Sequence, residues 1–185
     1  MTCVTKKALK ESLKKLALKK PVNRITIAEL TEHCGINRMT FYYHFQDIYD
    51  LVEWSIIDGV TIALEDKKTY DTWKQGFRQV LQIFLDNRDI VCSVYNSVNL
   101  EEIQKYLYSV MNDLLLDVIN EISEGRNLEQ IEKQAIADFY KYAFIGKLTN
   151  WFRKGMREDP DVIVEQLSLI AEGSLLPIIK RFQKS

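Results

Sequence analysis

Apolar residues recur along this chain with the period of an α-helix. Leu9, Leu13 and Leu16 follow the spacing i, i+4, i+7 and predict a first amphipathic helix, which Pro21 ends because proline disfavours helix in the residue before it. We find no convincing strand and no internal repeat, so we predict an all-α fold. The apolar spacing predicts helices over residues 5–19 (approximately), 37 or 38 to 45, 48–64, 89–95, 99–123 and 128–155. Three further helices are predicted to begin at residues 26, 71 and 160.

The predicted helices divide into a short head and a longer body. Residues 1–47 form a three-helix head, and residues 48–185 form a helical body in which helix 48–64 is the connector. The polar stretch E-D-K-K-T, residues 65–69, separates this connector from the helices that follow. We expect Gly173 and Pro177 to bend or break the last helix.

The stretch from Thr26 to Phe45 predicts two short helices around a tight turn. Thr26 and Glu29 have the spacing of a capping box. Gly35 stands where a chain leaving a helix often needs a positive φ, and Asn37 can cap the helix that follows. Two short helices joined by a turn with glycine are typical of the helix-turn-helix motif, whose second helix enters a DNA major groove.

Charge is distributed unevenly along the chain. Residues 1–50 hold nine Lys/Arg against five Asp/Glu, a net charge of +4, and the remaining residues hold sixteen against twenty-one, a net charge of −5. A basic first third on an acidic body favours one region that binds a polyanion. The alternative is that the lysines of the first helix form only a solvated face.

Composition indicates a cytoplasmic protein that does not enter a membrane. No uninterrupted apolar run reaches the roughly 18 residues needed to span a bilayer, and the lysine-rich N-terminus has no secretory h-region. The three cysteines are widely spaced and match neither a disulfide framework nor a zinc site, so we expect reduced thiols.

Catalytic chemistry is not predicted. The two histidines, His33 and His44, both lie within the helix-turn-helix stretch. The chain has no glycine-rich phosphate loop, no nucleophile elbow and no pair of metal ligands at i, i+4. We therefore expect neither an enzyme nor a site for a cofactor or metal.

The second helix of the motif carries an unusual set of hydrogen-bonding side chains. Ile36, Phe41 and Phe45 have the spacing to face the other helices of the head. Guanidinium, hydroxyl, phenol and imidazole groups suit base edges and phosphate oxygens, whereas a short tyrosine-rich core helix is the alternative. The side chains left for the other faces are Arg38, Met39, Thr40, Tyr42, Tyr43 and His44.

This stretch resembles a known family. The order G-I-N-R-M-T-F-Y-Y-H-F-Q-D-I-Y-D-L, residues 35–51, is similar to the DNA-binding signature of TetR-type transcriptional regulators. The resemblance implies a DNA-binding head, a C-terminal domain that dimerises through its last two long helices, and an effector pocket among the other helices. The stretch N-W-F-R-K-G-M-R-E-D-P, residues 150–160, resembles the branch that contains activators of dihydroxyacetone kinase operons.

The resemblance implies roles for individual residues. Bases of double-stranded DNA would be read by Arg38, Thr40 and Tyr43, together with Asn37. Phosphates would be held by Tyr42, His44, the start of the helix at Thr26, and Lys6.

Two positions depart from the family pattern. Ile48 stands where the family commonly has a lysine, and Gln46 stands where a basic residue is frequent. Up to two phosphate contacts per subunit are therefore in doubt. We keep as an alternative a protein-interaction module that has retained the helix-turn-helix scaffold but binds DNA weakly.

The body offers candidates for a homodimer interface and for an effector pocket. A symmetric operator needs two heads about one helical turn apart, so we expect residues 128–155 and 160–182 to dimerise. Aromatic stripes at helical spacing can line a cavity for an unknown effector or simply form packed core. The interface candidates are Phe139, Tyr142, Ala143, Gly146, Leu167 and Ile170, with the subunit's own core as the alternative; the pocket candidates are Trp73, Phe77, Phe84, Tyr95, Tyr106, Tyr108, Met111, Tyr140 and Trp151.

Overall fold

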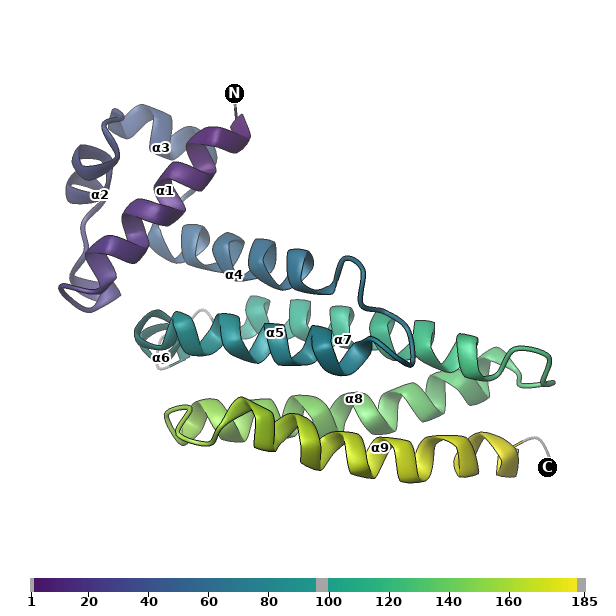
Figure 1. The fold of residues 1–185 in the computed structure, drawn as a ribbon. Helices are drawn as coiled ribbons and strands as arrows, with labels where there is room; N and C mark the ends of the chain where they lie inside the picture. Colours follow the sequence, from purple (N-terminus) through teal and green to yellow (C-terminus); the bar gives the residue numbers. More distant parts are fainter. Residues whose placement is uncertain (1, 96–99, 183–185) are drawn as a thin grey trace.

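The computed structural model describes the backbone of residues 2–95 and 100–182 and the side chains of residues 4–92 and 104–182. The described residues form nine α-helices, one 3-10 helix and no strand, which confirms the all-α prediction. Figure 1 shows α1–α3 gathered at one end, α4 leading from them to the body, and α8 and α9 running alongside each other. The elements are α1 (Thr2–Ala17), η1 (Val22–Arg24), α2 (Ile27–Cys34), α3 (Arg38–His44), α4 (Ile48–Leu64), α5 (Trp73–Asp86), α6 (Arg88–Tyr95), α7 (Leu100–Ile122), α8 (Gln130–Arg153) and α9 (Pro160–Phe182).

A small apolar core holds the three helices of the head together. Leu9 and Leu13 of α1, Leu30 of α2 and Phe41 of α3 all belong to the apolar core, and each of these side chains is at most 1% exposed. Burying each one contributes roughly 1.5–3 kcal/mol. This core fixes the direction in which the opposite face of α3 points.

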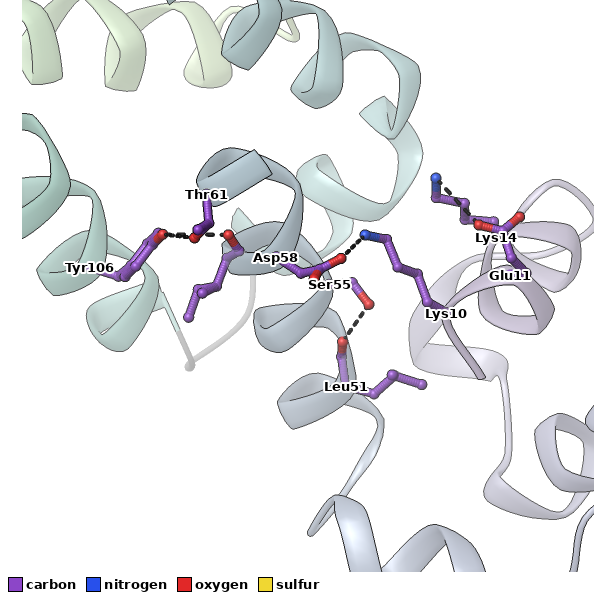
Figure 2. A network of polar contacts seen from close by, with 9 residues as sticks. Lys10, Glu11, Lys14, Leu51, Ser55, Asp58, Thr61 and Tyr106 are labelled. Carbon is purple, nitrogen blue, oxygen red and sulfur yellow. Dashed lines mark hydrogen bonds and ion pairs between the residues drawn. The ribbon is translucent and has the colours of Figure 1, made fainter. Parts of the chain in front are cut away.

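Helix α4 is attached to the head on one side and to the body on the other. Lys10 of α1 donates to Asp58 of α4 at 2.7 Å, and both side chains are largely buried. Farther along α4, the hydroxyl of Thr61 lies 2.7 Å from that of Tyr106 on α7 (Figure 2). Movement of α4 therefore strains contacts with both parts of the molecule.

Aromatic side chains dominate the core of the body. Phe144 of α8 packs edge-on against Trp73 and Phe77 of α5, with ring centroids 5.6 and 5.2 Å apart. The indole N–H of Trp151 donates to the backbone oxygen of Glu158 at 2.8 Å, which fixes the turn before α9. These contacts make α5, α8 and α9 one packed unit.

Helix α9 runs through the two positions that were expected to bend or break it. It continues without interruption to Phe182, so it does not break at Gly173 or Pro177, and the bend named as the other outcome stays a prediction. Pro177 cannot donate to the carbonyl of Gly173, but both residues are exposed, so this carbonyl is open to solvent. Leu175 and Ile179 are buried on either side of Pro177 and anchor both segments of the helix.

The amino end of α8 and the hydropathy of α9 complete the description of the body. Helix α8 is capped by Glu129, whose N–H donates to the carboxylate of Glu132 at 2.8 Å. By length and composition alone, α9 is long and apolar enough to cross a membrane, although the sequence showed no uninterrupted apolar run of that length. Ile163, Leu167 and other side chains of α9 are buried in the body.

Candidate nucleic-acid interface

The amino end of α2 is held by the predicted capping box. The hydroxyl of Thr26 accepts from the N–H of Glu29 at 3.2 Å, and the Glu29 carboxylate accepts from the N–H and the hydroxyl of Thr26, each at 2.9 Å. Lys20 donates to the other oxygen of Glu29 at 2.6 Å. Lys20, followed by these bonds from Thr26, lowers the pKa of Glu29 to about 2. The first N–H groups of α2, at Ile27 and Ala28, have no acceptor within the helix and are oriented for an anion.

The turn between α2 and α3 has the geometry that the sequence predicted. Gly35 has a φ of 71°, and its N–H caps the last carbonyls of α2. Ile36 follows, donates to the carbonyl of Thr31 at 3.0 Å, and packs half-buried against the core. The turn therefore sets the angle between the two helices through backbone bonds.

Helix α3 divides cleanly into a buried and an exposed side. Phe41 is 0% and Phe45 3% exposed, whereas Met39 and Tyr43 are each 78% and Tyr42 is 55% exposed. Arg38 is also exposed, at the first position of the helix. Large side chains left in solvent on a helix of two turns have no role in the core of the head.

The start of α3 is already ordered by its own side chains. The amide oxygen of Asn37 accepts from the N–H of Thr40 at 2.7 Å and from its hydroxyl at 2.9 Å. Asn37 is thus the helix cap as predicted, with its NH₂ directed elsewhere. Thr40 retains its hydroxyl lone pairs and its methyl group for a partner.

The predicted phosphate-binding residues lie at different depths. His44 is half-buried, and its ring meets that of Tyr43 edge-on at 4.9 Å. The ammonium of Lys6 lies 5.2 Å from the ring centre of Phe45 and 5.3 Å from that of Trp54. Lys6 is therefore held over one aromatic ring of the head and one of α4.

The amino end of α4 explains one of the two departures from the family pattern, Ile48, by its burial. Ile48 is only 8% exposed and belongs to the apolar core. Asp47 caps α4 by accepting from the N–H of Asp50 at 2.9 Å, and Asp50 in turn accepts from the N–H of Gln46 at 2.9 Å. The two carboxylates therefore occupy N–H groups at this end of α4 that could otherwise bind a phosphate.

One exposed side chain of α3 was missing from the predicted contact residues. Met39 lies one turn before Tyr42 and Tyr43 and is exposed to the same degree as Tyr43. Its i, i+3, i+4 spacing to the two tyrosines was the signal that could have made it a further candidate.

Three of the predicted pocket residues meet at one small cavity. Trp73, Met111 and Tyr140 line a hollow of about 20 Å³, little more than the space of one water. Burial raises the pKa of Tyr140, whose hydroxyl lies 2.6 Å from that of Ser174. Their role in effector binding stays a prediction.

The other predicted pocket residues are dispersed. Phe77 and Trp151 are fully buried, and Phe84 lines a different cavity beside α1. Tyr106 borders an open groove between α4 and α7. Tyr95 ends α6, and its side chain lies outside the described residues. Among the described residues no group of three or more His, Cys, Asp and Glu is placed to hold a metal ion.

An apolar face on α8 and α9 is exposed to solvent. Leu167, one of the predicted interface residues, is only 9% exposed and belongs to the subunit's own core, which was the alternative prediction. Ala143 and Gly146 are exposed on the same stretch of α8. The large apolar side chains on this face are Ile131 (75% exposed), Phe139 (66%), Tyr142 (62%), Val162 (41%), Leu169 (66%) and Ile170 (62%).

A three-helix head with this turn and this exposed helix defines a helix-turn-helix protein. Residues 11–53 match the family described as "Bacterial regulatory proteins, tetR family", and residues 71–173 match the one described as "Transcriptional regulator C-terminal region". The second match covers more than half of the chain. The chain therefore belongs to the tetR family and is a transcriptional regulator.

Individual relatives agree with this assignment. The chain is 24% identical over 87 residues to the HTH-type dhaKLM operon transcriptional activator DhaS of Lactococcus lactis, covering 47% of this chain and 46% of that protein. The match thus spans about half the length of the curated relative. The solved structure of the dihydroxyacetone kinase operon activator DhaS covers 98% of this chain and 99% of its own, with a TM-score of 0.76 and 18% identity.

A more distant structure has the same fold. NalD of Pseudomonas aeruginosa, described as the secondary repressor of the MexAB-OprM multidrug efflux pump, is 17% identical over 97% of both chains, with a TM-score of 0.57. Helical architecture is therefore shared with regulators named for quite different targets.

Proposed function

We propose that this regulator binds a palindromic DNA operator as a homodimer in the cytoplasm and that an effector controls this binding through the body. The observation that carries the proposal is the exposed side of α3, where polar and aromatic groups are held on a rigid head and have no role in its core. Such a surface is complementary to base edges and phosphates.

Base reading is assigned to the residues that point away from the head core. Arg38 is exposed at the first turn, where a guanidinium can fork onto a guanine, and Tyr43 is exposed one and a half turns later. Thr40 is pre-positioned by its bond to Asn37, so it loses little freedom on binding.

Phosphate binding is assigned to groups at the edges of the motif. The hydroxyl of Tyr42 and the ring N–H of His44 lie on α3, and the free N–H groups after Thr26 lie at the start of α2. Lys6 contributes its charge from α1. Because the ammonium of Lys20 pairs with the carboxylate of Glu29 and offsets its charge, Glu29 repels a nearby phosphate only weakly.

The apolar face of α8 and α9 supports the homodimer. Soluble monomers rarely leave large apolar side chains together on one surface, and here two neighbouring long helices both do so. Under two-fold symmetry the same face on a second copy covers it, and the two copies form a four-helix contact. The two domains then have different roles. The head, residues 1–47, binds DNA, and residues 48–185 bind the second copy and the effector.

Effector control is assigned to the connector. Because α4 is bonded to α1 through Asp58 and to α7 through Thr61, a ligand that prefers one position of α4 changes the spacing of the two heads. It shifts DNA affinity only by its differential affinity for the two states, typically about 1–3 kcal/mol.

The test compares operator and random DNA. Fragments co-purified with the protein identify its operator, and affinity for this operator and for a random duplex is then measured at low and moderate salt. We expect clear preference for the operator; equal affinity would instead support the protein-interaction module with weak DNA binding.

Two variants separate the roles on α3. Arg38→Ala should relax the preference at particular bases by roughly 1–3 kcal/mol, whereas Tyr42→Phe should weaken binding to all sequences alike. Arg157→Ala, which removes an exposed arginine of the body, is the matched control and should leave binding unchanged. Equal loss on every operator variant for Arg38→Ala would contradict its base-reading role.

A further inference from the structure

A cavity of about 140 Å³ lies where the head meets the body. It is bounded by α1 on the head side and by α4, α5 and α6 on the body side. None of the DNA-contact residues assigned above lines it, and Phe84 is the only predicted pocket residue that does. Its walls are formed by Lys10, Leu13, Lys14, Val52, Ser55, Ile56, Gly59, Ile83, Phe84, Asp86, Asn87, Ile90 and Val91.

The size of this cavity is that of a small organic molecule. An engineered apolar cavity of about 150 Å³ is known to bind benzene. By contrast, the hollow shared by Trp73, Met111 and Tyr140 holds about 20 Å³. The head–body cavity therefore accepts a ligand without repacking, whereas that hollow in the aromatic core does not.

The inner walls are apolar, and one ammonium at the edge, that of Lys14, has no carboxylate of the described residues closer than 3.9 Å. The lining carries two lysines and one aspartate. Lys10 is already paired with Asp58, and Asp86 accepts from the amide of Gln82 at 2.6 Å. Lys14 has only a long contact of 3.9 Å with Glu11, and its side chain is 41% exposed. Its ammonium is the group best able to bind an incoming carboxylate.

The cavity continues toward solvent beside Lys14. An outer hollow of about 390 Å³ shares Lys14, Asp86, Asn87 and Ile90 with it. The four charged residues of this outer hollow, Lys14, Arg88, Asp86 and Asp89, balance one another, so the selection of an anion rests on direct pairing with the Lys14 ammonium and not on net charge. This continuity gives a ligand a route past Lys14 with its apolar part leading.

We propose that this cavity is a binding site for a small apolar carboxylic acid of about the size of benzoate. The ring or branched alkyl group would occupy the apolar walls, and the carboxylate would pair with Lys14. Figure 2 shows that Lys10 and Lys14 extend from α1 on the side where Asp58 and Ser55 of α4 lie. A ligand between these helices acts directly on the position of the head; this regulatory meaning rests on the proposed function, whereas the binding itself does not.

The experiment measures binding to the full-length protein in the absence of DNA, so that it does not depend on operator recognition. Benzoate, benzyl alcohol and benzylamine share a ring and differ in charge, and each is titrated by calorimetry. We expect benzoate to bind most tightly and benzylamine at least about tenfold more weakly, because one charge-assisted contact is worth about this factor. Equal affinities, preference for the amine, or no binding of benzoate would overturn the proposal.

Two pairs of variants place the ligand. Ser55→Leu fills the cavity at the cost of one side-chain bond to the carbonyl of Leu51, and should weaken benzoate binding at least about tenfold. Ser109→Leu, on the exposed side of α7, is its control and should leave benzoate binding unchanged. Unchanged binding in Ser55→Leu would locate the ligand elsewhere and refute the site.

Lys14→Met keeps the length of the side chain and removes its charge. It should weaken benzoate about tenfold and leave benzyl alcohol unchanged, whereas Lys15→Met, next to it on the exposed side of α1, should affect neither. Equal losses for benzoate and benzyl alcohol in Lys14→Met would contradict the carboxylate contact. If benzoate binds as expected but no operator preference is found, the proposed function fails while the ligand site stands.

Discussion

Two helical surfaces of this molecule leave large side chains in solvent, and they do so with opposite chemistry. The exposed side of α3 presents Arg38, Tyr42 and Tyr43, whose polar groups need specific partners. The exposed face of α8 and α9 presents Phe139, Ile170 and their neighbours, which gain from any dry contact of the right shape. The first surface is suited to a foreign, charged partner and the second to another protein surface like itself.

This difference decides how each surface responds to substitution. An apolar face under two-fold symmetry meets its own copy, so each substitution appears twice in one interface. A recognition helix meets a different molecule, and each of its contacts carries only part of the specificity. Substitutions on the dimer face should therefore have the larger effects.

Phe139→Glu should have the largest effect. It introduces two carboxylates into the predicted contact, and burying unpaired charge costs several kcal/mol. Because Phe139 is 66% exposed in the isolated chain, the fold of each subunit should be kept. We expect a folded monomer by sedimentation and circular dichroism, with operator binding weakened at least about a hundredfold.

Ile62→Glu is the matched control for this change. Ile62 is an apolar residue 58% exposed on α4, away from α8 and α9. It should leave the oligomeric state unchanged. A Phe139→Glu protein that remains dimeric would show that α8 and α9 do not supply the interface.

The head was predicted from sequence more completely than the body, for a physical reason. Its cues are local: Thr26 with Glu29, Gly35 and Asn37 act within four residues, and the structure forms each cap as predicted. Such contacts depend little on what packs around them. The roles of single residues on DNA are a different matter, because they depend on a partner that the fold does not contain.

The body was harder to predict because its longest helix is apolar on more than one side. In α8, Phe144 and Ile136 face the core, whereas Phe139 and Ile131 face solvent. The sequence pattern shows that a position is apolar, but it does not show whether the side chain lies in the subunit's core or on its exposed face. The cavity between α1 and α5 is made by contacts between distant segments, so no local pattern signalled it.

Gly35→Ala should have the next largest effect and tests the head alone. Gly35 has a φ of +71° with no atom within 4 Å of an added Cβ, so the cost is backbone strain of roughly 1–2 kcal/mol. Thermal unfolding measures this loss. Gly125→Ala imposes the same strain in the body, where φ is +72° and space is equally open. Both variants should lose similar stability, but only Gly35→Ala should also weaken operator binding.

Gln46→Lys restores a charge that the family commonly places near this position. Gln46 is exposed just after α3, and its backbone bond to Asp50 does not involve the side chain. One new phosphate contact per subunit should steepen the dependence of log affinity on log salt by about 0.9 per subunit. Gln75→Lys adds the same charge to the exposed side of α5 and should leave the slope unchanged. An unchanged slope for Gln46→Lys would show that position 46 does not approach the DNA backbone.

The smallest expected effect concerns the capping box beside the recognition helix. Lys20, and then Thr26, lower the pKa of Glu29 from 4.5 to about 2. A depressed carboxyl pKa adds stability above the unfolded value, so this contribution is complete above about pH 4.5 and is lost as pH falls toward 2. Carboxyl NMR should show Glu29 titrating near 2 in the parent protein and closer to 4.5 in Lys20→Met, with Lys19→Met as the unaffected control. The stability change should be slight because the carboxyl is exposed, and a parent titration near 4.5 would mean that Lys20 does not hold Glu29 in solution.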